Sequence, residues 1–282
     1  MSKSLQAGAD PKVVAGTAAF SKFMTVLQRI ADGNAPPNVA ALAAATGFPR
    51  PTVYRIVAAL AAEGLIAEGV DEGTFALGPR LISLASRSWE RSSLRVASAQ
   101  VLAQLRDATR ETVHLAVPQQ DLMRGASDGL GMVYIDKLES PQTVRMASRI
   151  GTRVTLYSSS VGKAYLAALP PPVCDGLIER IAFARFTPNT IISRAKLRRE
   201  IKATVERGYA LDHEENELQI CCCGAAIRDA EGAPLGCVSI SMPLFRHSEA
   251  AARANASRLL DACAAVSARL GAAAGSGARR DG

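Results

Sequence analysis

The sequence predicts an α+β fold in two parts, an N-terminal winged helix-turn-helix and a larger domain of helices packed on an antiparallel sheet, joined by a short linker helix. Two observations carry this prediction. Before residue 91, apolar residues recur at helical spacing in short segments that glycines separate. After residue 91, candidate helices and strands follow one another without the regular alternation that a parallel βαβ sheet produces.

The first two helices are predicted from apolar spacing and capping residues. Four apolar residues share one face of the first helix: Phe20, Met24, Leu27 and Ile30. A second, short helix is expected over VAALAAAT, with Asn38 as its N-cap. Gly47 suits the left-handed turn after it. Two short helices joined across a tight turn form the helix-turn-helix unit.

The segment FPRPTVYRIVAALAAEGLI at 48–66 indicates the recognition helix and the start of a wing. Its predicted buried stripe consists of Val53, Ile56, Val57 and Leu60. Pro51 suits the first helical turn, where its missing N–H is no loss, and Gly64 suits the helix end. Two apolar segments, 65–67 and 74–77, then flank a DEG turn and predict the two strands of the wing. Gly78 and the proline after it open the linker helix.

The charge pattern of the recognition helix favours DNA binding. The chain of 282 residues carries a formal net charge of +7, but most of that excess lies after residue 90 and does not argue for DNA. Locally, no acidic residue occurs from 33 through 62, so phosphates meet no repulsion there. Without the wing and the arginines, simple helix packing would explain the pattern equally well. The residues predicted to contact DNA, mostly through its phosphates, are Arg50, Thr52, Tyr54 and Arg55.

The second domain is predicted to begin with a long helix whose apolar face carries Leu94, Ala97, Val101, Leu105 and Ala108. Strands are expected at 112–117, 132–138, 151–157 and 236–242, helices at 160–169 and 196–208, and a closing segment at 244–270. The residues after 271 are rich in alanine, glycine and serine and are predicted to be disordered.

Composition indicates a cytoplasmic globular protein. Hydrophobic residues make up 48% of the chain, and the six cysteines show no C-x-x-C spacing. Together with the absence of an N-terminal signal segment, this predicts free thiols in a reducing compartment. No apolar run approaches the roughly 18 to 20 residues needed to span a bilayer, so no membrane association is predicted.

The segment SSSVGKA at 158–164 has three interpretations. A P-loop is rejected, because Tyr157 stands where its first glycine belongs and Ala164 replaces its Ser/Thr. Ser160 and Lys163 match the S-x-x-K spacing of acyl-enzyme hydrolases, but no S-D-N or K-T-G triplet follows. The third interpretation is a helix N-terminus whose backbone N–H groups bind an anion such as a carboxylate. The serines would otherwise serve only as N-caps.

Two further groups of polar residues are candidate ligands. The acidic and histidine residues at 212–215 and the cysteines at 221–223 resemble metal ligands by type. Neighbouring strand residues point to opposite faces, however, and no spaced His/Cys pair completes a tetrahedral set, so no metal site is predicted. Most cysteines are interpreted as small buried hydrophobes. Ser239 and Ser241 share one strand face, where the fold or a polar ligand must supply their partners.

Four segments follow the winged helix-turn-helix in order: FALGPRLISLAS, LYSSSVGKAYLAALP, RGYALDHEE and GCVSISMP. With this order and spacing, nearly the whole chain resembles the IclR family of bacterial transcriptional regulators. The resemblance implies a C-terminal GAF-like α/β domain that binds a small effector. It also implies homodimers, commonly paired into tetramers, on a palindromic double-stranded DNA operator.

The resemblance further implies which residues hold a small carboxylate effector. Backbone N–H groups at Ser160 and Val161 would bind it. Side chains that join them would be those of Asp212, Cys222, Ser239 and Ser241. The apolar side of the pocket would consist of Met146, Val154 and Ile220. Gln219 and Met242 replace glycines that are common in the family, so the identity of the effector does not transfer.

We therefore predict a regulator that senses a small organic anion, a hydroxylated or aromatic monocarboxylate or a small keto acid, without a cofactor or a catalysed reaction. Two alternatives stay open: a serine hydrolase that uses Ser160 and Lys163, and a DNA-binding protein whose second domain senses no ligand. The predicted parts are a flexible arm (1–16), the winged domain (17–78), the linker helix (79–91), the effector-binding and oligomerisation domain (92–271) and a disordered tail (272–282).

Overall fold

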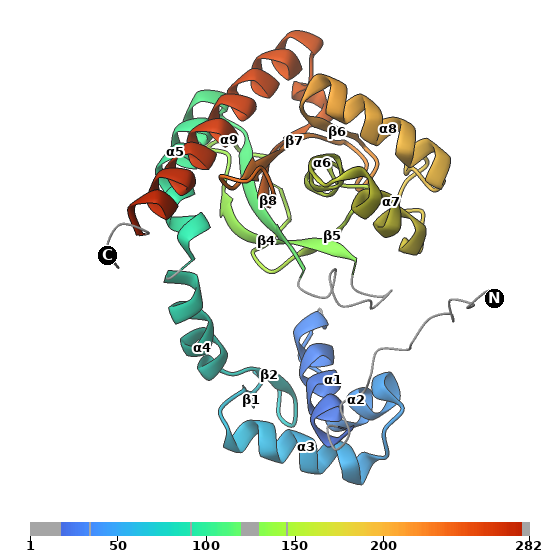
Figure 1. Ribbon diagram of the computed structural model, residues 1–282. Coiled ribbons are helices and arrows are strands. Elements are labelled where there is room, and N and C mark those ends of the chain that lie inside the picture. Colours follow the sequence, from blue (N-terminus) through green and yellow to red (C-terminus); the bar gives the residue numbers. More distant parts are fainter. Residues whose placement is uncertain (1–17, 34, 91, 120–129, 145, 278–282) are drawn as a thin grey trace, which may run out of the picture. The chain divides into compact units, whose positions relative to one another are not determined.

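The computed structural model describes residues 18–33, 35–90, 92–119, 130–144 and 146–277. The chain divides into two compact units, Met1–Ser92 and Ser93–Gly282, each with its own hydrophobic core (Figure 1). The predicted flexible arm, 1–16, lies outside the described residues. Within the described part, no helix combines the length and the apolar character required to cross a bilayer.

The first unit is a winged helix-turn-helix, as predicted. Its elements are α1 (Ala18–Asp32), α2 (Val39–Thr46), α3 (Arg50–Ala62), β1 (Ile66–Glu68), β2 (Phe75–Leu77) and α4 (Pro79–Glu90). The two strands pair antiparallel, with Ile66 opposite Leu77, and form the wing. The side chains of Ile66 and Phe75 join the core beneath the three helices.

Local signals in the sequence explain where α2 and α3 begin and end. The side-chain oxygen of Asn38 accepts the N–H of Ala41 at 2.9 Å and caps α2. Gly47 ends that helix at a φ of 71°, a left-handed conformation that glycine adopts without strain. The predicted buried stripe of α3 is confirmed: Val53, Ile56, Val57 and Leu60 are all buried.

Helix α1 buries only part of the apolar face that its spacing defines. Phe20 and Met24 are 66% and 45% exposed, whereas Leu27 and Ile30 are buried as expected. Val26 is fully buried, because α1 packs against α2 and α3 through the side that this residue shares with Ile30. The spacing therefore predicted the helix correctly but only half of its buried face.

The second unit is an α+β domain built on one antiparallel sheet, as predicted. Its strands are β3 (Thr112–Pro118), β4 (Gly131–Leu138), β5 (Arg153–Thr155), β6 (Ala210–His213), β7 (Ile220–Arg228) and β8 (Pro234–Pro243). They lie in the order β5-β4-β3-β8-β7-β6, and each neighbouring pair is antiparallel. β5 and β6 are thus the two edges of the sheet.

Helices cover both faces of this sheet (Figure 1). On one face, α5 (Ser93–Thr109) and α9 (Glu249–Gly277) pack against it through Leu102 and Leu259. The other face is covered by α6 (Ser160–Ala168), α7 (Pro171–Arg180) and α8 (Arg194–Arg207). A short 3-10 helix, η3 (Leu244–Arg246), connects β8 to α9.

Several details of the second unit differ from prediction, and strand β6 was not expected. Ala108 on α5 is exposed, and Ser98 and Leu102 complete the buried face instead. Helix α7 was not predicted, although Pro171 in its first turn is a regular way for a helix to begin. Helix α9 runs to Gly277, so 272–277, which the sequence assigned to the disordered tail, are helical.

Candidate functional site

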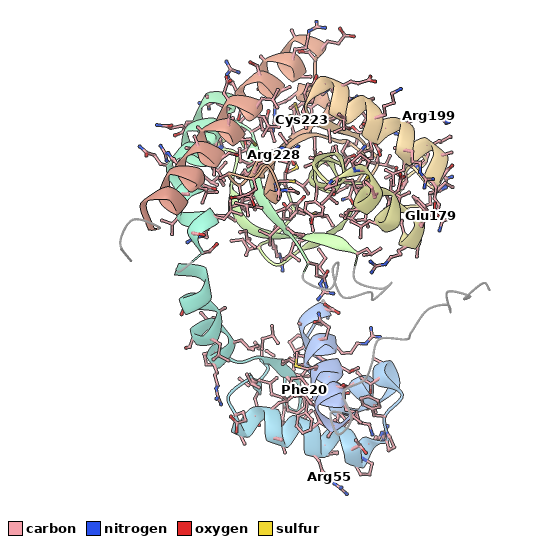
Figure 2. All side chains as sticks on the ribbon, viewed as in Figure 1. Phe20, Arg55, Glu179, Arg199, Cys223 and Arg228 are labelled. Atoms are coloured by element: carbon pink, nitrogen blue, oxygen red, sulfur yellow. The ribbon has the colours of Figure 1, made fainter. Side chains whose placement is uncertain are left out.

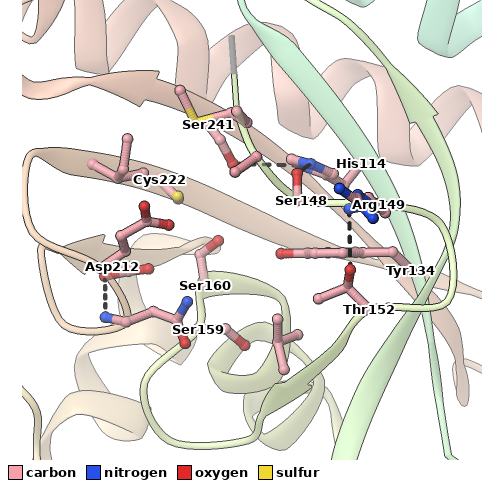
Figure 3. A pocket seen from close by; sticks show the side chains of 16 residues that line it. His114, Tyr134, Ser148, Arg149, Thr152, Ser159, Ser160, Asp212, Cys222 and Ser241 are labelled. Carbon is pink, nitrogen blue, oxygen red and sulfur yellow. Dashed lines mark hydrogen bonds between the residues drawn. The ribbon is translucent and has the colours of Figure 1, made fainter. Parts of the chain in front are cut away.

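A cavity of about 310 Å³ opens beside the N-terminus of α6, on the face of the sheet that α6 covers (Figure 3). It brings together seven of the predicted effector residues: Met146, Val154, Ser160, Asp212, Ile220, Cys222 and Ser241. The polar members come from α6 and from three adjacent strands, β6, β7 and β8. Sheet pairing therefore assembles one site from residues that lie far apart in the chain.

Helix α6 begins at the cavity because a serine caps it there. The Ser159 hydroxyl oxygen accepts the N–H of Gly162 at 3.1 Å and donates to the carbonyl of Thr155 at 2.7 Å. The N–H groups of Ser160 and Val161 belong to the first helical turn, which offers them no acceptor within the helix. Because a helix N-terminus also carries a partial positive charge, this end of the cavity favours an anion.

Two glycines allow α6 to lie directly against its neighbours. A Cβ atom at Gly224 on β7 would lie 2.7 Å from the carbonyl carbon and oxygen of Ser160. A Cβ atom at Gly162 would lie 2.3 Å from the carbonyl oxygen of Thr155. Any larger residue at either position would displace backbone, so both glycines hold Ser160 at the floor of the cavity.

Two predicted effector residues, Val161 and Ser239, are buried next to the cavity and are not among its lining residues. The Val161 side chain is fully buried in the core between α6 and the sheet, which leaves its backbone N–H as the group of interest. Ser239 on β8 pairs with His114 on one side and Gly224 on the other. Its Oγ is buried and, among the described residues, has no hydrogen-bond partner. An unpaired buried hydroxyl costs about 1 to 3 kcal/mol, which a polar ligand group would offset.

Asp212 supplies a buried carboxyl group to the cavity. Its Oδ1 accepts the backbone N–H groups of Glu215 at 2.8 Å and Asn216 at 3.4 Å. Burial raises the pKa of this carboxyl to about 7, although the Glu215 N–H and nearby Lys163 act in the opposite direction. Burial, and then the charge of Asp212, also raise the pKa of the Cys222 thiol well above its usual value. Cys222 is therefore a neutral thiol.

An aromatic pair that the sequence did not predict forms another wall. The His114 and Tyr134 rings stack with centroids 4.4 Å apart. His114 Nε2 lies 2.7 Å from the Ser148 hydroxyl, and its Nδ1 lies 3.4 Å from the Ser241 hydroxyl. Burial, and then the charge of Lys137, lower the pKa of His114 to about 3, so the imidazole is neutral. Burial raises the pKa of Tyr134 above its ordinary value.

Other lining residues were also missed: Ala147, Ser148, Arg149, Thr152, Ser159, Asn216 and Glu217. Only His114 left a signal in the sequence, as a lone polar residue in the middle of the apolar strand TVHLAVP. The other residues lie in loops between strands and helices. The position of these loops depends on how the sheet is assembled, so no local sequence pattern predicts that they line the cavity.

The family departure at Gln219 has a visible structural effect. Gln219 adopts a φ of 63°, in the left-handed region that favours glycine. Its N–H donates to Glu214 Oε1 at 2.8 Å, and its carbonyl accepts the Leu244 N–H at 2.8 Å. These bonds hold a non-glycine residue in a conformation that is otherwise unfavourable, next to Ile220 in the cavity wall.

Lys163 does not have the environment of a catalytic base. Its side chain is fully buried, and its Nζ lies 2.5 Å from Glu215 Oε1. A general base must be able to reach the proton that it abstracts, whereas this amine is held by a carboxylate partner in the interior. The S-x-x-K spacing of Ser160 and Lys163 is thus used for an ion pair in the interior.

The four residues predicted to contact DNA lie on or beside the free face of α3. Arg50 and Arg55 are exposed, Tyr54 is 64% exposed and Thr52 is half-buried. Figure 2 shows the Arg55 side chain pointing away from the winged domain. The buried stripe fixes the opposite side of the helix to the core, so this face stays available to a partner.

Comparisons with known proteins agree with this architecture. The model of the C-terminal domain of the bacterial transcriptional regulator IclR matches residues 87–268, and the IclR helix-turn-helix model matches residues 20–68. The HTH-type transcriptional regulator KdgR of Escherichia coli (strain K12) is 32% identical over 221 residues, 78% of this chain and 80% of KdgR. The transcriptional repressor IclR of the same strain is 28% identical over 227 residues, 80% of either chain.

Solved structures resemble both units of the chain. The crystal structure of the Thermotoga maritima IclR has 30% sequence identity and a TM-score of 0.70, with 89% of this chain and 98% of that chain covered. An IclR homologue from Microbacterium hydrocarbonoxydans, solved in complex with 4-hydroxybenzoate, has 21% identity and a TM-score of 0.74, with 90% of this chain and 100% of that chain covered. The second similarity is one of fold.

Proposed function

Because this chain belongs to the IclR family of bacterial transcriptional regulators, we propose that it binds a palindromic operator and senses a small organic anion in the cavity of its second unit. The observation that carries the proposal is the convergence on one cavity of a helix N-terminus, a strand hydroxyl and the buried carboxyl group of Asp212. The chain acts in the cytoplasm and catalyses no reaction.

The chemistry of the cavity supports a monocarboxylate as the effector. The N–H groups of Ser160 and Val161 and the hydroxyls of Ser239 and Ser241 donate to the carboxylate. Asp212 accepts from a ligand hydroxyl or a water and disfavours a second negative charge nearby.

The remaining walls support the same ligand class. The apolar wall contacts the body of the ligand through Met146, Val154 and Ile220. A hydroxylated or aromatic monocarboxylate, or a small keto acid, fits these requirements. The IclR homologue solved with 4-hydroxybenzoate holds a ligand of this class.

Regulation follows from coupling between the two units. A palindromic operator is bound by a symmetric dimer, in which each α3 contacts one half-site. The effector shifts the equilibrium between two arrangements of the paired winged domains. The size of the shift is set by the difference between its affinities for the two arrangements. Pairing of dimers into tetramers extends the same scheme to longer operators.

The test begins with an operator selected from genomic fragments by the full-length protein. Fluorescence anisotropy then identifies carboxylates that release it. Loss of one donor costs about 1 to 3 kcal/mol, so Ser239→Ala and Ser241→Ala should shift the effector dose response by roughly ten-fold or more. DNA affinity without effector should not change. Ser257→Ala, at an exposed serine on α9, is the matched control. An unaltered dose response in both cavity variants would place the ligand elsewhere.

Two further assays separate the alternatives. A hydrolase should turn over members of an ester and amide panel and lose that activity in Ser160→Ala, but the buried Lys163–Glu215 pair argues against it. A protein that senses nothing should show no thermal shift with any member of a metabolite library, because a ligand that binds only the native state raises its melting temperature.

A further inference from the structure

A cluster of metal-ligating side chains lies on the other side of the sheet from the cavity. It contains two of the three histidines of the chain and one of its six cysteines. His213 on β6 and Cys221 on β7 are directly opposite in register, so their side chains share one sheet face. His247 follows η3 and completes the group. One ligand atom from each residue lies within 4.8 Å of the other two.

We propose that His213, Cys221 and His247 form a binding site for a transition-metal ion of the zinc class. Imidazole nitrogen and thiolate sulfur are the ligands that Zn²⁺ prefers, at about 2.0 to 2.1 Å and 2.3 Å. Tetrahedral coordination brings such atoms to roughly 3.3 to 3.6 Å from one another, so the site must contract on binding. His213 is exposed and free to rotate toward the ion. Three protein ligands leave the fourth position to water or to another donor.

No side-chain hydrogen bond among the described residues competes for the three donor groups. The two imidazole rings meet edge to face, with centroids 5.5 Å apart. Within the described part of the chain, neither ring and no atom of the Cys221 thiol takes part in a side-chain hydrogen bond. Three soft or borderline ligands that share one corner of the fold without other partners are what a metal site requires.

This site is separate from the effector cavity, although both use the same two strands. Cys221 packs in the core beneath α5 and α9, whereas its neighbour Cys222 lines the cavity. In the same way, His213 and Asp212 are consecutive on β6 and point to opposite faces. A bound ion would fasten the edge strand β6 to β7 and to the segment before α9.

The experiment uses the full-length protein, stripped of metal by a chelator. Zn²⁺ is titrated against a chromophoric competitor, and Co²⁺ serves as a spectroscopic probe. We expect one ion per chain, a thiolate-to-cobalt charge-transfer band, the visible bands of tetrahedral Co²⁺ and a raised melting temperature. His213→Ala and His247→Ala should each lower zinc affinity by more than the roughly 10- to 100-fold lost when only an outer-shell partner is removed.

Matched variants identify the ligands. Cys221→Ser should abolish the charge-transfer band, whereas Cys263→Ser, at another buried thiol, and His114→Asn, at the third histidine, should bind zinc as the parent does. If Cys221→Ser does not fold, the two histidine variants decide the question, because His213 is exposed. Absence of stoichiometric zinc binding overturns the proposal. An unchanged zinc affinity in both histidine variants also overturns the proposal. If Cys222→Ala is then the variant that abolishes zinc binding, the ion lies in the cavity instead.

Discussion

Lys163 and Glu215 form a buried ion pair next to the cavity, with Lys163 Nζ 2.5 Å from Glu215 Oε1. Lys163 is one helical turn from Ser160, and the N–H of Glu215 donates to Asp212. The pair therefore joins α6 to the connection between β6 and β7, and it does so at the point where both contribute to the cavity. The two charges affect stability mainly because leaving either one buried without its partner is costly.

Removing one member of this pair should destabilise the protein strongly. Lys163→Met leaves the Glu215 carboxylate buried without its partner, so the free energy of unfolding should fall by about 3 to 5 kcal/mol. The double variant Lys163→Met/Glu215→Leu removes both charges and should recover much of that loss. Urea denaturation of the variants measures the effect. Arg198→Met, which breaks exposed pairs with Asp175 and Glu179, is the control and should move the unfolding midpoint far less.

Arg55→Ala should weaken operator binding and reduce its salt dependence. Each phosphate contact contributes about one unit to the slope of log affinity against log salt concentration, so the slope should fall by about one. Anisotropy titrations at several salt concentrations measure both quantities. Arg258→Ala, at an exposed arginine on α9, should change neither. If Arg55→Ala behaves like this control, the DNA contact lies elsewhere.

Gly224→Ala should disturb the cavity floor. Its Cβ would lie 2.7 Å from the Ser160 backbone and must displace α6, which should cost about 1 to 3 kcal/mol and weaken effector binding. The same change at Gly176 on α7 meets no atom within 4 Å and should stabilise the helix by roughly 0.5 to 1 kcal/mol. Urea denaturation measures the change in the free energy of unfolding for each variant. A decrease for Gly224→Ala and an increase for Gly176→Ala would support the close approach of β7 to α6. A neutral Gly224→Ala contradicts it.

His114 should make the protein less stable in mild acid. Its pKa falls from 6.5 to about 3 on folding, so its contribution is complete above pH 6.5 and is lost as the pH falls below that value. At about pH 5.5 protonation favours the unfolded state by about 1.4 kcal/mol. Urea denaturation at about pH 7.5 and 5.5 should therefore show a stability loss about 1 kcal/mol smaller in His114→Asn than in the parent. Equal losses would mean that His114 is protonated in the native state.

The winged domain was largely predictable because its signals are local. Asn38 and Gly47 bound one helix, and the stripe from Val53 to Leu60 follows the helical period without interruption. The helical spacing did not predict that Phe20 in α1 is exposed. Apolar residues lie on two sides of this helix, and only its packing against the neighbouring helices determines which side is buried. A single helix contains no information about that choice.

The cavity was predictable only through the family resemblance. Ser160 and Asp212 meet because β6, β7 and β8 pair in one register, and no local pattern fixes that register. His114 faces Tyr134 across β3 and β4, whose register shifts between Leu115 and Ala116. The sequence predicted no metal site because it offers no spaced His/Cys pair; the group of His213, Cys221 and His247 forms only when β6 pairs with β7 and the chain has passed through β8 and η3.

The glycine at position 224 also has a consequence for how such a regulator diversifies in evolution. Substitutions at the cavity floor should rarely change effector specificity, because even one added methyl group at Gly224 displaces α6. At the rim of the cavity, Ser148 is half-buried and Arg149 is exposed, and both lie in the connection between β4 and β5. Duplicated copies of this gene should therefore come to recognise new effectors through substitutions at the rim, while the floor at Ser160 and Gly224 passes unchanged from one copy to the next.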